Sequence, residues 1–252
     1  MAGIKSFCEM KTFKTSVERT VGPAIAEIFD RSMDSTEQKI ECFPRYARRQ
    51  QLKRFLAMYE IFKLALPVKG SVVECGVFRG FGLMSWAKLS AILEPENLTR
   101  RIYGFDTFEG FPTLSSKDEN AHTQTHIGDL NGSSHAELEA LIELHDRDRF
   151  LGHISKVQLV KGDIAATAPK FVADHPHLLV SLLFIDCDLY EPTKTALKCF
   201  LPRMPKGAIL AFDELDNPQW PGETLALLEE IGAPRLELRR LEWDPYISYA
   251  II

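Results

Sequence analysis

Short apolar runs alternate with amphipathic helical patterns along most of the chain. Runs of this length, with few polar residues, are typical of strands that are buried on both faces of a sheet. The predicted strands cover residues 71–77, 101–106, 157–160, 178–185 and 207–212, and helical patterns occur at 83–93, 134–144, 166–174, 191–201 and 222–230. The alternation predicts an α/β fold of the Rossmann-like type, with a mostly parallel sheet and helices on both faces.

The C-terminal part of the chain has a different pattern. Residues 236–243 and 246–252 form alternating or apolar runs, and Asp244-Pro245 joins them. Two such runs connected by a short turn are typical of a hairpin. We therefore expect an antiparallel strand pair at the edge of the sheet.

The N-terminal part is helical. Residues 47–66 carry apolar side chains at three- and four-residue steps, which is typical of an amphipathic helix that packs on a core. Residues 1–46 are less regular and contain only short helical patterns, such as 21–31. We expect an N-terminal helical extension over residues 1–46 and an α/β domain over 47–252.

A polar, turn-rich stretch interrupts the alternation at about residues 113–150. It ends in a helix that begins with a capping box at Ser134. A polar insertion of this length inside a compact domain is usually a lid or a binding loop. We interpret His122, His126 and Asp129 in this lid as surface residues, and the alternatives are metal ligands or a histidine over the substrate.

Composition and charge argue against several classes of partner. The chain has 252 residues, 45% of them hydrophobic, and its formal net charge of −5 argues against a general binder of nucleic acids or anionic membranes. No apolar run reaches the roughly 18 residues of a membrane span, and residues 1–16 lack the apolar core of a secretory signal. The five cysteines show no C-x-x-C spacing, so we expect reduced thiols in a cytoplasmic protein.

The first predicted strand runs into a glycine-rich turn, which reads Glu74-Cys75-Gly76-Val77-Phe78-Arg79-Gly80-Phe81-Gly82. Its spacing differs from the G-x-G-x-x-G of dinucleotide sites, because Phe78 occupies the position where a second glycine would let a pyrophosphate approach. Glu74 is a poor neighbour for a pyrophosphate and a good one for the ammonium of an amino-acid tail. Together with Asp106, which would bind ribose hydroxyls, the turn favours S-adenosylmethionine over NAD.

Carboxylates follow two of the other predicted strands. Asp186 and Asp188 end one strand, and Asp213-Glu214 ends the next. Because the carboxyl ends of neighbouring parallel strands meet at one edge of a sheet, we expect Asp186, Asp213 and Glu214 to bind Mg²⁺, which prefers oxygen ligands. Asp188 would face the same pocket as a general base. The alternatives are a helix cap for Asp188 and a structural loop acid for Asp213.

Four long motifs occur in order along the α/β domain: Glu-Cys-Gly-Val-Phe-Arg-Gly, Tyr-Gly-Phe-Asp-Thr-Phe-Glu-Gly-Phe-Pro, Phe-Ile-Asp-Cys-Asp-Leu-Tyr-Glu-Pro-Thr and Trp-Pro-Gly-Glu-Thr. They resemble the macrocin O-methyltransferase (TylF-like) family of class I methyltransferases, over roughly residues 47–252. The resemblance implies the use of S-adenosylmethionine and a divalent metal, usually Mg²⁺, to methylate sugar hydroxyls, often on antibiotics. It also implies that Asp188 is the base. Where the family has Asp-Asp, this chain has Asp213-Glu214.

The candidate site residues fall into three groups. Asp188 is the candidate catalytic base, and the candidate metal ligands are Asp186, Asp213 and Glu214. The candidate cofactor-binding residues are Glu74, Gly76, Phe78, Arg79, Gly80, Ser85, Asp106, Thr107, Phe108, Gly162, Asp163, Ile164 and Asp186. Asp163 has a second interpretation as a helix N-cap, and Trp220 is expected either to stack on a sugar or to pack in the core.

We therefore expect a metal-dependent O-methyltransferase that acts on a hydroxyl of a sugar or sugar-bearing small molecule, in natural-product or nucleotide-sugar biosynthesis. A catechol-like or other vicinal diol acceptor is the first alternative, because the same metal template would serve it. An NAD-dependent oxidoreductase and an inactive S-adenosylmethionine-binding module are the second and third hypotheses. We also expect a homo-oligomer, with neither a nucleic acid nor a membrane as partner.

Overall fold

The computed structural model describes residues 15–120, 123–132 and 134–252, and the chain divides into two compact units. One unit extends to Leu56, and the other runs from Ala57 to Ile252. The boundary lies inside helix α3 (Arg49–Ala65), whose second half belongs to the larger unit. The division that the sequence places between residues 46 and 47 stays a prediction.

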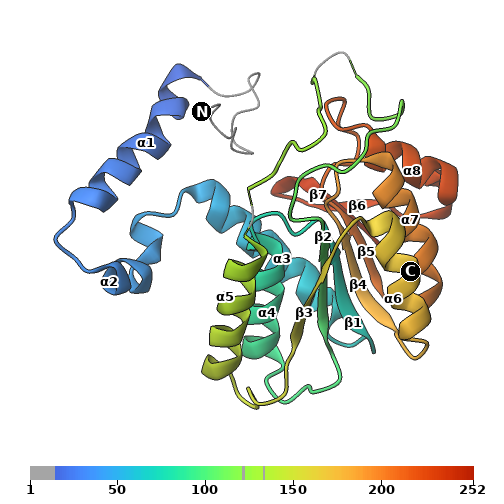
Figure 1. Ribbon diagram of the computed structural model, residues 1–252, viewed down its shortest axis with the longest axis horizontal. Coiled ribbons are helices and arrows are strands. Elements are labelled where there is room, and N and C mark those ends of the chain that lie inside the picture. Colours follow the sequence, from blue (N-terminus) through green and yellow to red (C-terminus); the bar gives the residue numbers. More distant parts are fainter. Residues whose placement is uncertain (1–14, 121–122, 133) are drawn as a thin grey trace. The chain divides into compact units, whose positions relative to one another are not determined.

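A seven-stranded sheet forms the centre of the larger unit (Figure 1). Its order is β3-β2-β1-β4-β5-β7-β6; the first five strands run parallel, and β7 is antiparallel to both β5 and β6. The strands are β1 (Ser71–Cys75), β2 (Ile102–Asp106), β3 (Val157–Lys161), β4 (Val180–Ile185), β5 (Ile209–Phe212), β6 (Arg239–Leu241) and β7 (Asp244–Ile251). The predicted Rossmann-like fold with its C-terminal antiparallel pair is confirmed.

The turn between β6 and β7 differs in one detail from the prediction. β7 already begins at Asp244, so the chain reverses before Asp244-Pro245 and not at it. Asp244 pairs with Leu241 across the hairpin and is only 4% exposed, and its carboxylate accepts the N–H of Ile247 at 3.2 Å. This bond holds Asp244 inside the strand.

Helices cover both faces of the sheet (Figure 1). The second half of α3 lies on one face with α4 (Phe81–Leu93) and α5 (His135–Asp148). The other face carries α6 (Ile164–Asp174), α7 (Tyr190–Phe200) and α8 (Gly222–Glu230), with short 3-10 turns at Leu201–Arg203 and Ala233–Arg235. The helical patterns predicted from the sequence in this unit are all present.

The core is densest around β1 and β4, in which every residue is buried. On one face, the Trp86 ring of α4 lies 6.2 Å from the ring of Phe62 and 5.6 Å from that of Phe184. On the other face, Phe105 meets Phe171 edge-on at 5.2 Å. Full burial of each such side chain stabilises the fold by about 1.5–3 kcal/mol. The two central strands therefore provide a rigid base for the loops at their ends.

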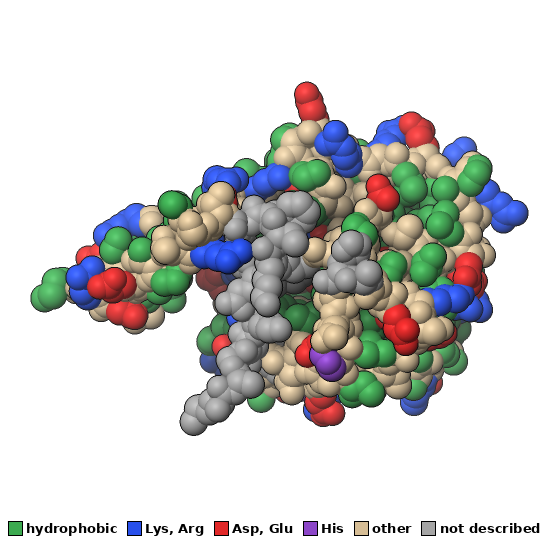
Figure 2. All heavy atoms as spheres, turned by 90° about the horizontal axis from the view of Figure 1, so that it is seen from above, with side chains coloured by type: hydrophobic (Ala, Val, Ile, Leu, Met, Phe, Trp, Pro, Cys, Tyr) green, Lys and Arg blue, Asp and Glu red, His purple; other side chains and the backbone are tan. Residues whose placement is uncertain are grey.

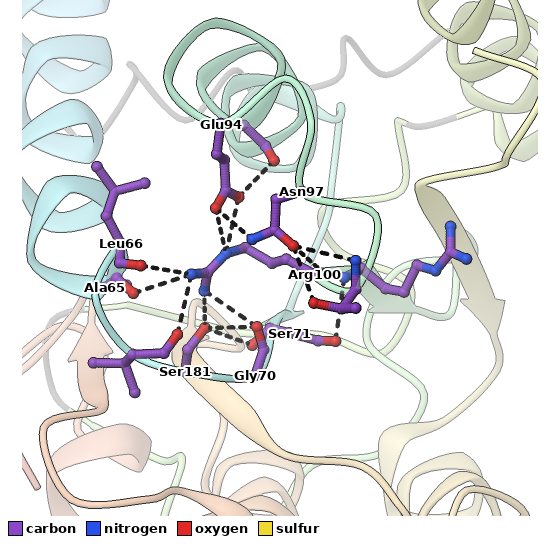
Figure 3. A network of polar contacts seen from close by, with 12 residues as sticks. Ala65, Leu66, Gly70, Ser71, Glu94, Asn97, Arg100 and Ser181 are labelled. Carbon is purple, nitrogen blue, oxygen red and sulfur yellow. Dashed lines mark hydrogen bonds and ion pairs between the residues drawn. The ribbon is translucent and has the colours of Figure 1, made fainter. Parts of the chain in front are cut away.

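A buried arginine joins α3 to the amino-terminal edge of the sheet (Figure 3). Arg100 is 3% exposed, and its guanidinium pairs with Glu94 at 2.8 Å. Its remaining N–H groups donate to the carbonyl oxygens of Ala65, Leu66, Val68 and Gly70 and to the hydroxyl of Ser181. This network lies at the edge of the sheet opposite the strand ends that carry the candidate site.

The smaller unit contains α1 (Ser16–Arg31), α2 (Thr36–Glu41) and a 3-10 turn at Phe43–Arg45. Thr15 and Glu18 form a complete capping box, which explains why α1 begins before the helical pattern predicted at residue 21. No residue of α1 is buried. No helix within the described ranges is long and apolar enough to span a membrane. On the surface in Figure 2, acidic and basic side chains are interspersed with hydrophobic ones.

Candidate active site

The carboxyl ends of four adjacent strands lie side by side at one edge of the sheet. In the order β2, β1, β4 and β5 they carry Asp106, the glycine turn, Asp186 with Asp188, and Asp213-Glu214. This is the edge where open α/β sheets bind their ligands. The structure thus gathers the acids and the turn that the sequence singled out.

The glycine turn lies in direct contact with the segment that follows β4. Gly76 has a φ of 92°, and a Cβ at this position would lie 1.8 Å from the carbonyl oxygen of Asp186. The N–H of Asp186 donates to the carbonyl of Cys75 at 2.8 Å. Only glycine fits such a contact, and the contact fixes the turn against the first candidate metal ligand.

The carboxylate of Asp106 holds the same turn from the side of β2. Its Oδ2 accepts the N–H groups of Val77 and Phe78, both at 2.8 Å, and its Oδ1 accepts that of Phe108 at 2.6 Å. Phe78 has a φ of 49°, which a non-glycine residue adopts only when its surroundings compensate the strain. Asp106 therefore braces the turn, a role that the sequence did not indicate. A carboxylate has about four lone-pair sites, so one stays available for a ribose hydroxyl.

Two candidate cofactor residues are buried next to the turn. Glu74 is 1% exposed, and a Cβ on Gly82 would lie 2.0 Å from its Oε1, so the carboxyl lies directly against the start of α4. Ser85 is 5% exposed, and its hydroxyl donates to the carbonyl of Phe81 in the same helix at 2.6 Å. Glu74 therefore lies beneath the turn, and the Ser85 hydroxyl is hydrogen-bonded to the backbone of α4.

A cavity of about 320 Å³ lies beside the ends of β2 and β3. Its lining consists of Thr107, Glu109, Gly110, Phe111, Pro112, Ile127, Gly128, Lys161, Gly162 and Asp163. Asp163 also caps α6, since its carboxylate accepts the N–H of Ala165 at 2.9 Å, so its interpretation as an N-cap is confirmed. The candidate residues Phe108 and Ile164 are each 6% exposed and lie outside the lining.

Asp188 is buried directly after β4. It is 5% exposed, has a φ of 61°, and its Oδ1 has no hydrogen-bond partner. Burial, followed by the charge of Asp186, raises the pKa of Asp188 well above its usual range. The alternative role as a helix cap is wrong: the N-cap of α7 is Leu189, and the N–H of Tyr190 donates instead to Asp118 at 2.7 Å. A buried carboxyl with a raised pKa at a strand end is a candidate general base.

The other acids share this confined region. Asp213 and Glu214 are 2% and 4% exposed, and their charges also raise the pKa of Asp188. The side-chain amide of Asn217 donates to Glu214. Among the described residues, no group of three or more His, Cys, Asp or Glu side chains is arranged to hold a metal ion. The acids are therefore gathered at one edge without forming a coordination sphere.

The lid insertion packs against the glycine turn through its helix. The hydroxyl of Ser134 accepts the N–H of Glu137 at 3.1 Å and caps α5. A Cβ on Gly80 would lie 2.3 Å from the side chain of Leu138, so α5 lies directly on the turn. The Arg79 guanidinium lies 5.2 Å from the Phe78 ring centroid.

Trp220 and the histidines of the lid occupy separate places. Trp220 packs edge-on against Phe111, with ring centroids 5.9 Å apart, as its packing interpretation expects. His126 lies at the surface, with Nδ1 3.5 Å from Asp129. His122 lies outside the described residues.

Sequence reasoning missed two buried acids at this edge. Asp118 is 6% exposed and joins the lid to α7 through the N–H of Tyr190. Glu223 is 0% exposed and binds backbone N–H groups after both β4 and β5. Glu223 stands within the Trp-Pro-Gly-Glu-Thr motif, which was a usable signal, whereas Asp118 lies in a polar stretch that gives none.

Residues 73–215 match a sequence family described as a methyltransferase domain, and this segment is more than half of the 252 residues. The chain belongs to this family. The matched part of the methyltransferase domain begins in β1 and ends just after β5, so it contains the glycine turn and the acids at both strand ends.

Several known methyltransferases are similar to this chain. The 8-demethyl-8-(2,3-dimethoxy-alpha-L-rhamnosyl)-tetracenomycin-C 4'-O-methyltransferase of Streptomyces olivaceus is 28% identical over 152 residues, which are 60% of this chain and 55% of that protein. The chain thus matches about half the length of this curated relative.

Two solved structures of the calicheamicin methyltransferase CalS11 extend the likeness to the whole chain. One has a TM-score of 0.90 and 33% identity over 100% of this chain and 98% of that one. The other, the apo form described as a TDP-rhamnose 3'-O-methyltransferase, has a TM-score of 0.83 and 33% identity, over 95% and 96% of the two chains. The O-methyltransferase NovP shares the fold, with a TM-score of 0.58 and 20% identity over 79% of each chain.

Proposed function

We propose that the protein is an S-adenosylmethionine- and Mg²⁺-dependent O-methyltransferase that acts on a hydroxyl of a sugar or sugar-bearing small molecule. The observation that carries this proposal is the buried Asp188 beside a glycine turn, in a chain 33% identical to CalS11. The relatives are named as a rhamnosyl-tetracenomycin 4'-O-methyltransferase and a TDP-rhamnose 3'-O-methyltransferase. These names support a sugar hydroxyl as the acceptor and a role in natural-product biosynthesis, and membership of the macrocin O-methyltransferase family stays a prediction from the sequence.

The cofactor would occupy the ends of β1, β2 and β3. S-adenosylmethionine supplies a methyl group on a sulfonium sulfur. Gly76 would let its amino-acid part approach the backbone, with the Glu74 carboxyl beneath the turn as the counter-charge for the ammonium. Asp106 would accept a ribose hydroxyl, and the cavity next to Gly162 and Asp163 would take the adenine.

The metal ion would lie between the ends of β4 and β5. Asp186, Asp213 and Glu214 offer only carboxylate oxygens, which is the donor chemistry that Mg²⁺ prefers. The Asp188 oxygen that lacks a partner supports the same choice, because a cation would compensate the negative charge gathered there. Bound Mg²⁺ would polarise the acceptor hydroxyl and lower its pKa. The candidate ligands would have to turn toward it, since they form no coordination sphere as they lie.

The chemistry then needs one proton transfer and one displacement. Asp188 takes the proton of the acceptor hydroxyl, and the oxygen forms a bond with the methyl carbon. S-adenosylmethionine would supply this methyl group, and its carbon–sulfur bond would break with the electron pair on sulfur to leave S-adenosylhomocysteine. Asp188 is buried at the end of β4, and this burial keeps water away from the proton transfer.

Membership of the methyltransferase family favours S-adenosylmethionine over NAD at the glycine turn. The catechol-like acceptor stays the alternative substrate class, and the homo-oligomer and the cytoplasmic location stay predictions from the sequence.

The test is methyl transfer to a panel of TDP-sugars and rhamnosylated aglycones, measured by mass spectrometry as the gain of one methyl. We expect transfer with MgCl₂ and none with EDTA. Asp188→Asn should lower turnover by about 10²- to 10⁴-fold, the usual contribution of a general base, and leave the affinity for S-adenosylhomocysteine unchanged. Asp174→Asn is the control, because Asp174 is an exposed acid that pairs with Lys170.

Each part of the proposal has its own contradicting result. If no sugar gains mass and catechols do, the acceptor is a catechol-like diol and not a sugar. Full turnover of Asp188→Asn would show that Asp188 is not the general base. Turnover in EDTA would show that the reaction does not need a metal ion.

A further inference from the structure

Glu223 is buried where the two acid-bearing strand ends meet, and the proposed chemistry does not use it. It lies in the first turn of α8 and is 0% exposed. Its Oε1 accepts the N–H groups of Cys187 at 2.9 Å and Asp188 at 3.1 Å, and its Oε2 accepts that of Glu214 at 3.2 Å. One side chain therefore binds the backbone beyond both β4 and β5.

We propose that Glu223 is a positioning residue that sets the place of the base relative to the candidate metal ligands; this inference rests on the proposed function. The parallel ladder joins β4 and β5 as far as the bond from the Asp213 N–H to the Ile185 carbonyl, at 3.0 Å. Beyond that bond, Glu223 connects the two segments through Asp188 and Glu214. Small displacements of reacting groups are costly, since about 1 Å can lower a rate by about 10²-fold.

The backbone at Asp188 needs such support. A φ of 61° is left-handed, and a non-glycine residue held there costs about 1–3 kcal/mol. The N–H of Leu189 donates to the carbonyl of Cys187 at 2.6 Å and closes a tight turn around it. Because Oδ1 of Asp188 has no partner, the backbone largely sets the direction of this carboxyl, and Glu223 holds that backbone.

The residue before Glu223 makes its approach possible. A Cβ on Gly222 would lie 2.5 Å from the backbone nitrogen of Tyr190 and 2.7 Å from Oδ1 of Asp118. Glycine therefore lets the first turn of α8 lie against the first turn of α7. This close approach brings the Glu223 carboxyl within hydrogen-bonding distance of both strand ends.

The chemistry of the site selects a carboxylate. Three N–H donors converge on Glu223, and a carboxylate accepts all of them with its two oxygens. Glutamine has one oxygen, so its NH₂ group would face the N–H of Glu214 or those of Cys187 and Asp188. Glu223→Gln therefore keeps the volume of the side chain and loses at least one of the three bonds.

The experiment compares the wild type, Glu223→Gln and Glu223→Asp with Glu230→Gln as the control. Glu230 lies on the same helix and pairs with Lys194 and Lys198 at 3.8 and 3.5 Å. Amide hydrogen exchange at Cys187, Asp188 and Glu214 is measured with S-adenosylhomocysteine bound. A buried N–H that loses its partner costs about 1–3 kcal/mol, so we expect exchange at least about five-fold faster in Glu223→Gln. The control should exchange like the wild type.

Kinetics give the second measurement. For an acceptor that the wild type methylates, we expect kcat to fall by about 10²-fold in Glu223→Gln, while the KM for S-adenosylmethionine stays within about three-fold because the glycine turn is untouched. Glu223→Asp should recover part of kcat. If Glu223→Gln does not fold, Glu223→Asp is compared with the wild type in its place.

The outcomes separate this inference from the proposed function. Unprotected amides at the three positions in the wild type, or wild-type exchange and kcat in Glu223→Gln, would overturn the positioning role. If no acceptor is methylated by the wild type, the proposed function fails, and amide exchange still decides whether Glu223 orders the two strand ends.

Discussion

Left-handed backbone conformations occur at several residues of the candidate site, among them Gly76, Phe78 and Asp188. Gly76 is pressed against the carbonyl of Asp186, Phe78 is held by Asp106, and Asp188 is held by Glu223. Left-handed conformations of non-glycine residues persist only where the surrounding structure compensates their cost. The carboxylates of Asp106 and Glu223 supply this compensation, so the strain lies at the residues to which we assign cofactor binding and proton transfer.

A buried histidine in α5 makes the stability of the protein depend on pH. His145 of α5 is 7% exposed, and its Nε2 has no hydrogen-bond partner. Burial, followed by the charge of Lys88, lowers the pKa of His145, and the charges of Asp146 and Asp148 oppose this shift only in part. The unfolded chain therefore binds this proton more readily than the folded one.

We expect His145 to lower the stability of the protein as the pH falls below about 6.5, the ordinary pKa of histidine. The effect is absent above that pH and grows as the pH falls toward the lowered pKa, by at most about 1.4 kcal/mol per pH unit for one proton. Urea unfolding at about pH 7.5 and about pH 5.5 measures it. His145→Leu should lose less stability between these pH values than the wild type.

The control for this experiment is His153→Leu, because His153 is exposed. It should show the pH dependence of the wild type. The same pH dependence in His145→Leu and the wild type would show that protonation of His145 is not responsible.

At the scale of elements, Arg100 joins more parts of the fold than any one strand pairing does. Its guanidinium connects the end of α3, the beginnings of β1 and β4, and Glu94 at the C-cap of α4 (Figure 3). Arg100→Met would leave the largely buried Glu94 carboxylate without its cation and would remove a donor from several carbonyl groups, so we expect a loss of about 3–5 kcal/mol in the free energy of unfolding. Denaturant unfolding measures this loss.

Arg147→Met is the matched control, because Arg147 is an exposed residue that pairs with Glu143 along α5. Such surface pairs contribute at most about 1 kcal/mol. If the two variants lose the same free energy of unfolding, the Arg100 network does not stabilise the packing of α3 on the sheet more than a surface ion pair does. Affinity for S-adenosylhomocysteine should persist in folded Arg100→Met, since the network lies at the opposite edge from the glycine turn.

The hydrophobic pattern was sufficient to predict the elements of the larger unit. Strands buried on both faces read as apolar runs, and all five parallel strands and the terminal pair were predicted in this way. The pattern also predicted which edge carries the acids, because parallel strands end together. It was less precise at the ends of elements, where single hydrogen bonds such as that from Ile247 to Asp244 decide the boundary.

The hydrogen-bond partners of Asp106 and Asp118 could not be predicted in the same way. The periodicity of hydrophobic residues indicates which positions are buried. It does not indicate which hydrogen-bond donor a carboxylate contacts. Asp106 binds backbone N–H groups 28 and 29 residues before it, and Asp118 binds the N–H of a residue 72 positions later. These contacts depend on the packing of loops against strand ends, so Asp106 was given only a ligand role and the part of Asp118 was missed.

The two compact units of the whole molecule differ in how their helices are stabilised. In the larger unit, α3 contributes Ala57, Met58, Ile61, Phe62 and Ala65, all fully buried. In the smaller unit, α1 has no buried residue and depends on its capping box and on contacts between exposed side chains. Since most helical stability comes from the packing of an apolar face, the larger unit has its own core without α1.

We therefore expect a chain that begins at Ala47 to fold and to bind S-adenosylhomocysteine with unchanged affinity. Its free energy of unfolding should lie within about 1 kcal/mol of the full chain, because Lys39 is the only buried residue among the described residues 15–46. A chain that begins at Leu66 is the control: it loses Met58, Ile61 and Phe62 from the core, at about 2–5 kcal/mol each, and should not fold. Circular dichroism and calorimetry measure both. Failure of the longer chain to fold would place residues 1–46 inside the cooperative unit of the methyltransferase domain.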